Sequence, residues 1–270
     1  MQTILHHGSD VAVLGLGTWQ MRGDACTAGV ERALALGYRH IDTAQGYLNE
    51  AEVGEGMRRS GVPRDDVFLT TKLRPRNFRK RDVIDSTHES LTALGVETVD
   101  LLLMHWPNPE VPLEETLGAM RDLRDRGAIR HIGVSNFPPS LAERACELTE
   151  MFTNQVEYHP YLSQGALLRQ AERLDYLVTA YSPLAQGRAG DDVVLQEIGA
   201  AHHKTPGQVA LRWLIQQAHV LAIPKAASAD NQRANIEIFD FELSEEEMAA
   251  VAGLDRDERL TDDMNVDWER

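Results

Sequence analysis

Four side chains that can move a proton or hold a carbonyl oxygen stand at or just beyond the ends of apolar segments. Asp42 and Tyr47 follow one such segment, Lys72 ends the next, and His105 follows the one after it. An unperturbed tyrosine has a pKa of ~10 and is a poor acid near neutrality. A neighbouring ammonium would lower that pKa, and a carboxylate behind the lysine would keep the lysine charged. We therefore expect Tyr47 to donate a proton and His105 to hydrogen-bond a carbonyl, which suits reduction by a cofactor that delivers hydride.

Each of these residues also has a purely structural interpretation. Asp42 could cap a loop or pair with Lys72 as a buried salt bridge, His105 could be a satisfied core histidine, and Ser135-Asn136 could cap a helix. A lysine on a strand is also how Schiff-base aldolases form imines, so an aldolase acting through Lys72 is an alternative function. A non-catalytic binding protein on the same fold is a further alternative.

Metal and serine-hydrolase chemistry fit the sequence poorly. Among the candidate residues at the strand ends, His105 is the only histidine and stands with one carboxylate, and the chain has no Cys cluster and no His-x-His pair, so no metal site is expected. A serine nucleophile elbow, Gly-x-Ser-x-Gly, does not occur. The pairs His6-His7 and His202-His203 lie elsewhere in the chain and are expected to be exposed.

Apolar runs alternate with amphipathic segments along most of the chain. The short apolar runs predict strands buried on both faces, as in a parallel sheet. The predicted strands are residues 14–19, 39–43, 67–73, 99–106, 129–136, 153–157, 177–182 and 220–225. Between several of them, apolar residues three and four apart precede Gly37, Gly95 or Gly127 and predict helices that end at a glycine. Ser244 with Glu247 three positions later predicts a capping box.

Eight parallel strands joined by helices predict an α/β fold, either an open doubly wound sheet or a closed barrel. The count of eight, and the missing third glycine in residues 15–19 after the first strand, favour a single (β/α)8 TIM barrel. Residues 4–7 and 11–13 predict an N-terminal β-hairpin before it, and residues 1–270 are expected to form one domain. In such a barrel the carboxyl ends of all strands meet at one rim, so the polar and aromatic residues at those ends should converge.

The composition excludes several classes of partner. A formal net charge of −15 and a pI near 5.1 argue against binding nucleic acid or an anionic membrane. No run of ~18 apolar residues predicts a membrane span, and the first residues lack the pattern of a secretory signal. Cys26 and Cys146 are the only cysteines and suggest no disulfide framework. A cytoplasmic protein is expected.

Eight short motifs in this chain resemble those of the aldo-keto reductase family. They are His40–Ala44, Tyr47–Glu50, Thr70–Lys72, Leu103–Pro107, Ile132–Phe137, Asn154–Pro160, Ala180–Leu184 and Ile223–Lys225. The resemblance extends from about residue 15 to the C-terminus. Within the family, the chain is most similar to the compact bacterial 2,5-diketo-D-gluconate reductases, which also reduce methylglyoxal and other small aldehydes.

The resemblance implies NAD(P)H-dependent reduction of small aldehydes and ketones by a monomer. Tyr47 would be the general acid, Lys72 and Asp42 would tune it, and His105 would orient the carbonyl. The residues implied to hold the cofactor are Ser135, Asn136 and Gln155 at the carboxamide, Tyr181 against the nicotinamide ring, Ser182, Leu184, Gly17 and Thr18 along the channel, and Lys225 at the adenosine 2′-phosphate. Those implied to wall the substrate pocket are Trp19, Trp106 and Trp268.

The segment after Lys225 departs from the family pattern. The family usually has Ser next, Arg six positions after the Lys, and Glu-Asn at nine and ten, whereas this chain has Ala226, Asn231, Ala234 and Asn235. Only Lys225 and Asn235 are kept, so we expect a modest preference for NADPH and leave NADH use open. The loop over residues 107–112 is short, which implies an open pocket with little selectivity for bulky substrates.

Overall fold

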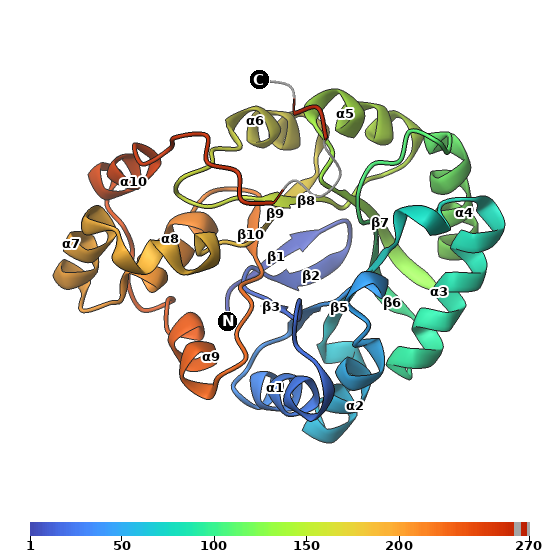
Figure 1. Cartoon of the computed structure of the whole chain (residues 1–270), viewed down its shortest axis with the longest axis horizontal. Helices are drawn as coiled ribbons and strands as arrows, with labels where there is room; N and C mark the ends of the chain where they lie inside the picture. Colours follow the sequence, from blue (N-terminus) through green and yellow to red (C-terminus); the bar gives the residue numbers. More distant parts are fainter. Residues whose placement is uncertain (262–265, 269–270) are drawn as a thin grey trace.

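Eight parallel strands form the centre of the molecule, and helices lie around them (Figure 1). The computed structural model describes residues 1–261 and 266–268. The strands are β3 (Leu16–Gly17), β4 (His40–Asp42), β5 (Phe68–Leu73), β6 (Val99–Met104), β7 (Ile129–Ser135), β8 (Thr153–Glu157), β9 (Leu177–Tyr181) and β10 (Val220–Ala222). They pair in sequence order, and parallel bridges from Leu14 to Ala222 and from Gly17 to Lys225 join the first strand region to the last. The predicted (β/α)8 barrel is confirmed.

The first barrel strand is shorter than the predicted residues 14–19, and two glycines bring this part of the chain unusually close to its neighbours. A Cβ at Gly17 would lie 2.7 Å from the carbonyl oxygen of Ile223, and one at Gly15 would lie 2.8 Å from the ring of His40. Backbone hydrogen bonds nevertheless continue the ladder, from Gly15 N to the carbonyl of Ala222 and from Gly17 N to that of Pro224. The glycines therefore serve barrel closure and do not form a dinucleotide-binding turn of the doubly wound kind.

Ten helices of the described chain surround the barrel. They are α1 (Gly23–Ala35), α2 (Glu50–Ser60), α3 (Lys80–Leu94), α4 (Leu113–Asp125), α5 (Pro139–Leu148), α6 (Gly165–Leu174), α7 (Val193–His202), α8 (Pro206–Ile215), α9 (Ala229–Ile236) and α10 (Glu245–Ala252). Gly95 ends α3 with φ 68, the left-handed conformation that glycine adopts without strain. The predicted capping box of Ser244 and Glu247 is present at α10. A second capping box, between Thr205 and Gln208 at α8, was not predicted.

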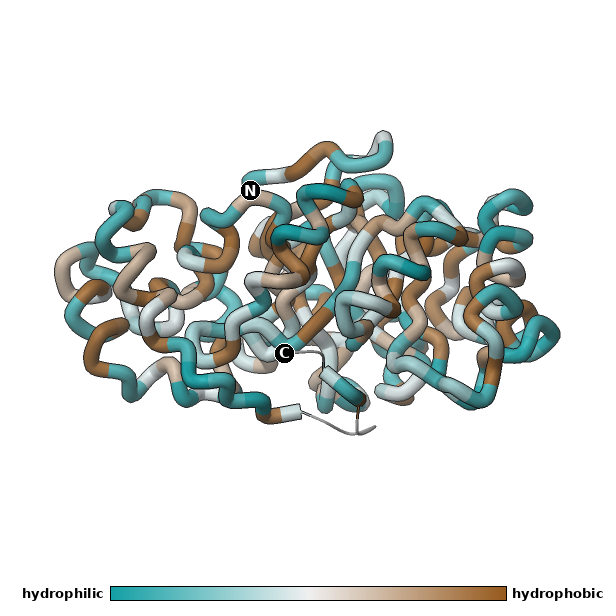
Figure 2. Tube along the Cα trace, turned by 90° about the horizontal axis from the view of Figure 1, so that it is seen from above, coloured by the Kyte–Doolittle hydropathy of each residue, from teal (hydrophilic) through white to brown (hydrophobic). Residues whose placement is uncertain are grey.

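Apolar side chains fill the space inside the barrel and between barrel and helices. Strands β4, β5, β6 and β8 are buried along their whole length, as expected for a sheet covered on both faces. Figure 2 shows hydrophobic segments running through the middle of the molecule and hydrophilic segments recurring around its periphery. No helix in the described part of the chain is long and apolar enough to cross a membrane.

The N-terminal hairpin covers the amino ends of the barrel strands. Strands β1 (Thr3–His6) and β2 (Ser9–Ala12) are antiparallel and are joined at His7 and Gly8, which both have positive φ. This is a two-residue turn, slightly earlier than predicted. The ring of His6 packs 5.0 Å from that of Phe152 and keeps only 7% exposure, so the expectation that His6 is exposed was wrong. His6 is buried because the hairpin packs against aromatic residues of the barrel.

Candidate active site

A cavity of about 290 Å³ opens at the carboxyl ends of the strands, where the sequence places its candidate residues. The predicted site residues that line it are Gly17, Trp19, Asp42, Tyr47, His105, Trp106, Ser135, Asn136, Gln155, Tyr181, Ser182 and Lys225. Three more lining residues, Gly46, Ile223 and Thr261, were not among the predicted ones. Gly46 directly precedes one of the motifs and Ile223 begins another, whereas Thr261 comes from the C-terminal segment and carries no motif that would have identified it.

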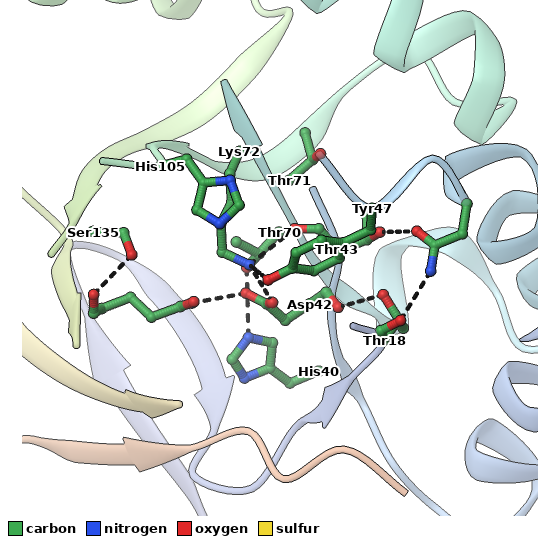
Figure 3. A network of polar contacts seen from close by, with 12 residues as sticks. Thr18, His40, Asp42, Thr43, Tyr47, Thr70, Thr71, Lys72, His105 and Ser135 are labelled. Carbon is green, nitrogen blue, oxygen red and sulfur yellow. Dashed lines mark hydrogen bonds and ion pairs between the residues drawn. The ribbon is translucent and has the colours of Figure 1, made fainter. Parts of the chain in front are cut away.

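A chain of three side chains connects the barrel interior to this cavity (Figure 3). Lys72, on β5, is completely buried, and its ammonium donates to the Oδ1 atom of Asp42 at the end of β4. The same Nζ donates to the carbonyl of Thr43 at 3.1 Å and to the Tyr47 hydroxyl at 3.2 Å. Three acceptors from the end of β4 and the loop after it therefore fix the position of one cation, carried by β5, beneath the phenol.

Burial and charge act in opposite directions on these groups. Burial disfavours the Lys72 ammonium, but the Asp42 carboxylate and Tyr47 together raise the pKa of Lys72 above its ordinary value. Burial, together with the negative charge of Asp42, raises the pKa of Tyr47, and the lowering effect of the Lys72 ammonium does not offset it. The expectation of a lowered phenol pKa is therefore wrong, although the Lys72 ammonium acts in the predicted direction. Tyr47 keeps its proton near neutrality, and the adjacent cation would stabilise the phenolate left after that proton is donated.

His105 faces the cavity as a neutral imidazole. Burial, together with the positive charges of Lys72 and Arg74, lowers the pKa of His105 to about 3. Its ring lies edge-on to that of Tyr47, with 5.6 Å between the ring centroids. A neutral histidine has one N–H to donate, so His105 can hydrogen-bond an oxygen that also receives a proton from Tyr47.

Four polar residues from neighbouring strand ends form a connected network beside the tyrosine. Gln155 donates to Oδ2 of Asp42 at 2.8 Å, and its carbonyl accepts from the hydroxyl of Ser135. The Asn136 amide donates to Ser135 and accepts from the Tyr181 hydroxyl at 2.8 Å. These contacts fix the orientation of the amides at one wall of the cavity, and the ring of Tyr181 lies beside them.

Asn49 supports the loop that presents Tyr47, a role that the motifs did not reveal. It is fully buried and donates to the carbonyls of Thr18 and Met21 at 2.9 and 3.0 Å. Its side-chain oxygen accepts from Thr43, and Thr18 in turn donates to the carbonyl of Asp42. Thr18 thus lies behind the cavity wall as a structural partner of Asp42. A buried asparagine must satisfy its hydrogen bonds, and here it satisfies them by holding the loop after β4.

Several predicted residues lie away from the cavity surface. Leu184 is partly buried and packs against the core near α8, and Asn235 is buried on α9. Asn231 is exposed on the first turns of α9, where its backbone N–H bonds the Ser228 hydroxyl. Trp268 lies under the guanidinium of Arg259, 3.7 Å from its carbon to the ring centroid. The proposed contacts of these residues with cofactor or substrate remain predictions.

The donor set of the cavity suits a nicotinamide dinucleotide and does not suit a metal. In the described residues, no group of three or more His, Cys, Asp or Glu side chains could hold a metal ion. One wall carries the ordered Asn136 and Gln155 side chains beside the Tyr181 ring, which fits an amide-bearing aromatic ring. The exposed Lys225 lies at the same cavity, and its ammonium fits a phosphate.

Comparison with known proteins gives one family. Residues 13–256 match the aldo/keto reductase family. Methylglyoxal reductase DkgB of Escherichia coli O157:H7 is 39% identical over 255 residues, which are 93% of this chain and 95% of that protein. The 2,5-diketo-D-gluconic acid reductase B of Corynebacterium sp. is also 39% identical, over 93% of this chain and 92% of its own. A crystal structure of an aldo-keto reductase of Bombyx mori in complex with NADP has a TM-score of 0.91 at 32% identity, covering 98% of this chain and 96% of that one.

Proposed function

This chain belongs to the aldo/keto reductase family, and from that premise we propose that it reduces small aldehydes and ketones to alcohols with NADPH. The substrates proposed are methylglyoxal and carbonyls resembling diketo-gluconate, in accord with the names of its relatives. The observation that carries the proposal is the buried Asp42–Lys72–Tyr47 chain, which ends on a phenol at a cavity that His105 also faces.

Each of the four candidate catalytic residues has a separate role in the reduction of the carbonyl. His105, neutral at physiological pH, donates a hydrogen bond that orients the carbonyl and polarises it. Tyr47 transfers its proton to the oxygen as negative charge develops there, and the Lys72 ammonium, 3.2 Å from the phenol oxygen, stabilises the resulting phenolate. Asp42 keeps that ammonium charged and in place. A reduced nicotinamide, when bound, supplies the hydride.

The cofactor would lie along the wall formed by Ser135, Asn136 and Gln155, with Tyr181 against its ring. Lys225 would bind the adenosine 2′-phosphate, which is the reason that we propose NADPH as the preferred cofactor. Trp19 and Trp106, which line the cavity, would enclose the substrate together with His105. We further propose a monomer that acts in the cytoplasm, where Cys26 and Cys146, both unpaired, would stay reduced.

The aldolase alternative is less consistent with the surroundings of Lys72. A Schiff-base lysine attacks as a neutral amine, yet the Lys72 pKa is raised and its Nζ donates to three acceptors. Lys72 is also fully buried and lies behind Tyr47. Borohydride added with a carbonyl substrate should therefore leave Lys72 unmodified, and a covalent adduct on this lysine would favour the aldolase.

Steady-state assays test the proposal directly. Methylglyoxal, an aromatic aldehyde and a keto-sugar would each be assayed with NADPH and with NADH, and the alcohol product identified. We expect reduction of at least the small dicarbonyl, with NADPH favoured. A protein that binds NADPH but reduces none of these carbonyls would point to the non-catalytic alternative.

A further inference from the structure

The C-terminal segment contributes to the cavity from outside the barrel. After α10 (red in Figure 1) the chain runs back over the carboxyl ends of β8 and β9, and Thr261 becomes a lining residue. This segment has no regular secondary structure over residues 255–261. The hydrogen bonds that hold it to the barrel therefore determine where Thr261 lies.

One buried carboxylate binds two consecutive amides of this segment. Glu157, the last residue of β8, has no exposed surface. Its Oε1 accepts from the backbone N–H of Leu260 at 2.8 Å, and its Oε2 accepts from that of Thr261 at 2.9 Å. Because each oxygen takes a different amide, the pair fixes the register of the segment, as bidentate contacts do.

A neighbouring histidine completes the site. The Nδ1 atom of His159, also fully buried, accepts from the backbone N–H of Tyr161 at 3.3 Å. Its proton must then be on Nε2, which lies 2.8 Å from Oε1 of Glu157 and donates to it. Three N–H donors thus surround the carboxylate, and no lysine or arginine in the described chain forms an ion pair with it. A buried anion is costly unless such donors are present, so the tail amides and Glu157 stabilise each other.

The rest of the loop after β8 binds the tail upstream of this point. The carbonyl of Tyr161 accepts from the N–H groups of Arg256 and Glu258, and the Arg256 guanidinium lies 4.1 Å from the Tyr161 ring centroid. The N–H of Ser163 donates to the Asp255 carboxylate at 3.1 Å. These contacts hold residues 255–258 near the barrel, whereas the Glu157 pair reaches Thr261, the residue of this segment that lines the cavity.

We propose that Glu157 is a positioning residue for substrate selection: its carboxylate holds the tail so that Thr261 limits the size of the substrate cavity. The inference rests on the proposed reductase function. Glu157 does not touch the reacting atoms, so it acts on which carbonyl is accepted and leaves the proton transfer to Tyr47. Release of the tail would move Thr261 away and admit a larger group beside the carbonyl.

The test compares two dicarbonyls that differ only beside the ketone, methylglyoxal and phenylglyoxal, in Glu157→Gln and wild type. A glutamine offers one acceptor oxygen and an NH₂ that would face an N–H donor, so at least one tail contact is lost. We expect the ratio of kcat/KM for phenylglyoxal over methylglyoxal to rise by ~5–10-fold, through KM, on the scale of a lost pocket contact. The Kd of NADPH should stay close to that of wild type.

Two further variants keep the test decisive. Thr261→Pro removes the amide that Oε2 accepts, leaves Glu157 in place, and should produce the same shift in the ratio. The double variant, Glu157→Gln with Thr261→Pro, should shift the ratio no further than either single change, because both changes disrupt the same contact between residue 157 and the tail. Asp100→Asn, which alters another buried carboxylate at the opposite end of the barrel, is the matched control and should leave the ratio unchanged.

Hydrogen exchange of the tail gives a readout that does not require turnover. Amides of residues 255–261 should exchange faster in Glu157→Gln than in wild type. Unchanged tail exchange, an unchanged substrate ratio, additive single variants, or an equal shift in Asp100→Asn would each overturn the inference. A wild-type protein that reduces neither dicarbonyl would overturn the proposed function instead. The exchange result would still show whether the Glu157 carboxylate holds the tail amides in place.

Discussion

Both ends of the barrel contain a buried carboxylate bound by basic side chains, but the two clusters terminate differently. At the amino ends, Asp100 accepts from Arg64 at 2.7 Å, from Arg130 at 2.8 Å and from the N–H of Leu69. Arg130 is 46% exposed, so this cluster continues into solvent. At the carboxyl ends, the side chains of Asp42 and Lys72 are 1% and 0% exposed. From this pair, the Lys72 ammonium donates a hydrogen bond to the Tyr47 hydroxyl at the cavity.

We interpret the amino-end cluster as a stabilising one and the carboxyl-end cluster as the reactive one. Arg130 stays partly in water, so its pairing with Asp100 costs little desolvation, and Asp100 satisfies the N–H of Leu69, which makes this cluster a contributor to stability. A fully buried ammonium is costly, and a buried pair is by itself weak evidence for stability. We interpret the buried Lys72–Asp42 pair as retained for its effect on the Tyr47 proton. Changes at the carboxyl end should therefore affect turnover first, and changes at the amino end should affect stability first.

The largest effect is expected from Lys72→Met. Turnover of methylglyoxal with NADPH should fall by ~10²–10⁴, because Tyr47, the proposed general acid, loses the cation that would stabilise its phenolate. The remaining activity should extend to higher pH, since the phenol pKa rises when the ammonium is removed. A pH–rate profile measured beside Lys80→Met checks this, as Lys80 is an exposed lysine paired with Asp122. Preserved activity with an unchanged profile would make Lys72 only a structural pair.

A smaller, purely thermodynamic effect is expected at the hairpin end in acid. Burial, aided by the charge of His7, lowers the pKa of His6 and of His131 to about 4 each, although Asp175 and Asp100 respectively oppose this. A folded pKa below the unfolded value means that the unfolded chain binds protons first as pH falls. Stability is thus complete above pH ~6.5 and declines progressively towards pH ~4.

The measurement is the free energy of unfolding as a function of pH for wild type, His6→Phe and His88→Phe. His6→Phe should flatten the decline between neutrality and pH ~4 while turnover at neutral pH stays near wild type. His88 is exposed, and its replacement should leave the slope unchanged. An identical pH slope in all three proteins would show that the hairpin histidine does not contribute to acid instability.

The smallest effect concerns cofactor choice at the carboxyl end. Asn231 is exposed on α9 and lacks the planar guanidinium that an arginine would offer a phosphate. We expect wild type to prefer NADPH modestly and Asn231→Arg to raise the ratio of kcat/KM for NADPH over NADH by about tenfold, the equivalent of ~1.4 kcal/mol. Gln196→Arg adds the same charge on α7 and should not change the ratio. A preference for NADH in wild type would contradict the placement of the phosphate at Lys225.

Much of this comparison could be predicted from the sequence, because parallel barrel strands bring their carboxyl ends to one rim. That rule places Asp42, Tyr47 and His105 together without any knowledge of helix packing, and it leads to Lys72 as well. The net direction of the Tyr47 pKa could not be predicted, since it depends on how far burial outweighs one ammonium. Sequence patterns report the types of charge present, but not the depth at which the fold places them.

Contacts made by irregular segments could also not be predicted from the sequence. The burial of His6 depends on where the hairpin turns and on Phe152, far along the chain. The role of Glu157 depends on two backbone amides about a hundred residues later, which carry no side-chain signal. Asn49 likewise acts through the carbonyls that it bridges. Such contacts involve backbone groups that every residue possesses, so no motif marks them.

The central claim is that the carboxyl-end cluster serves turnover and the amino-end cluster serves stability. Its most direct test measures turnover and unfolding free energy in Tyr47→Phe and Asp100→Asn side by side. Tyr47→Phe should lose ~10²–10⁴ in methylglyoxal turnover, keep NADPH binding, and change the unfolding free energy by no more than ~1 kcal/mol. Asp100→Asn should lose ~1–3 kcal/mol of stability and retain turnover near that of wild type. A Tyr47→Phe protein that still reduces methylglyoxal within about threefold of the wild-type rate would contradict the account, because general-acid catalysis is typically worth far more than that.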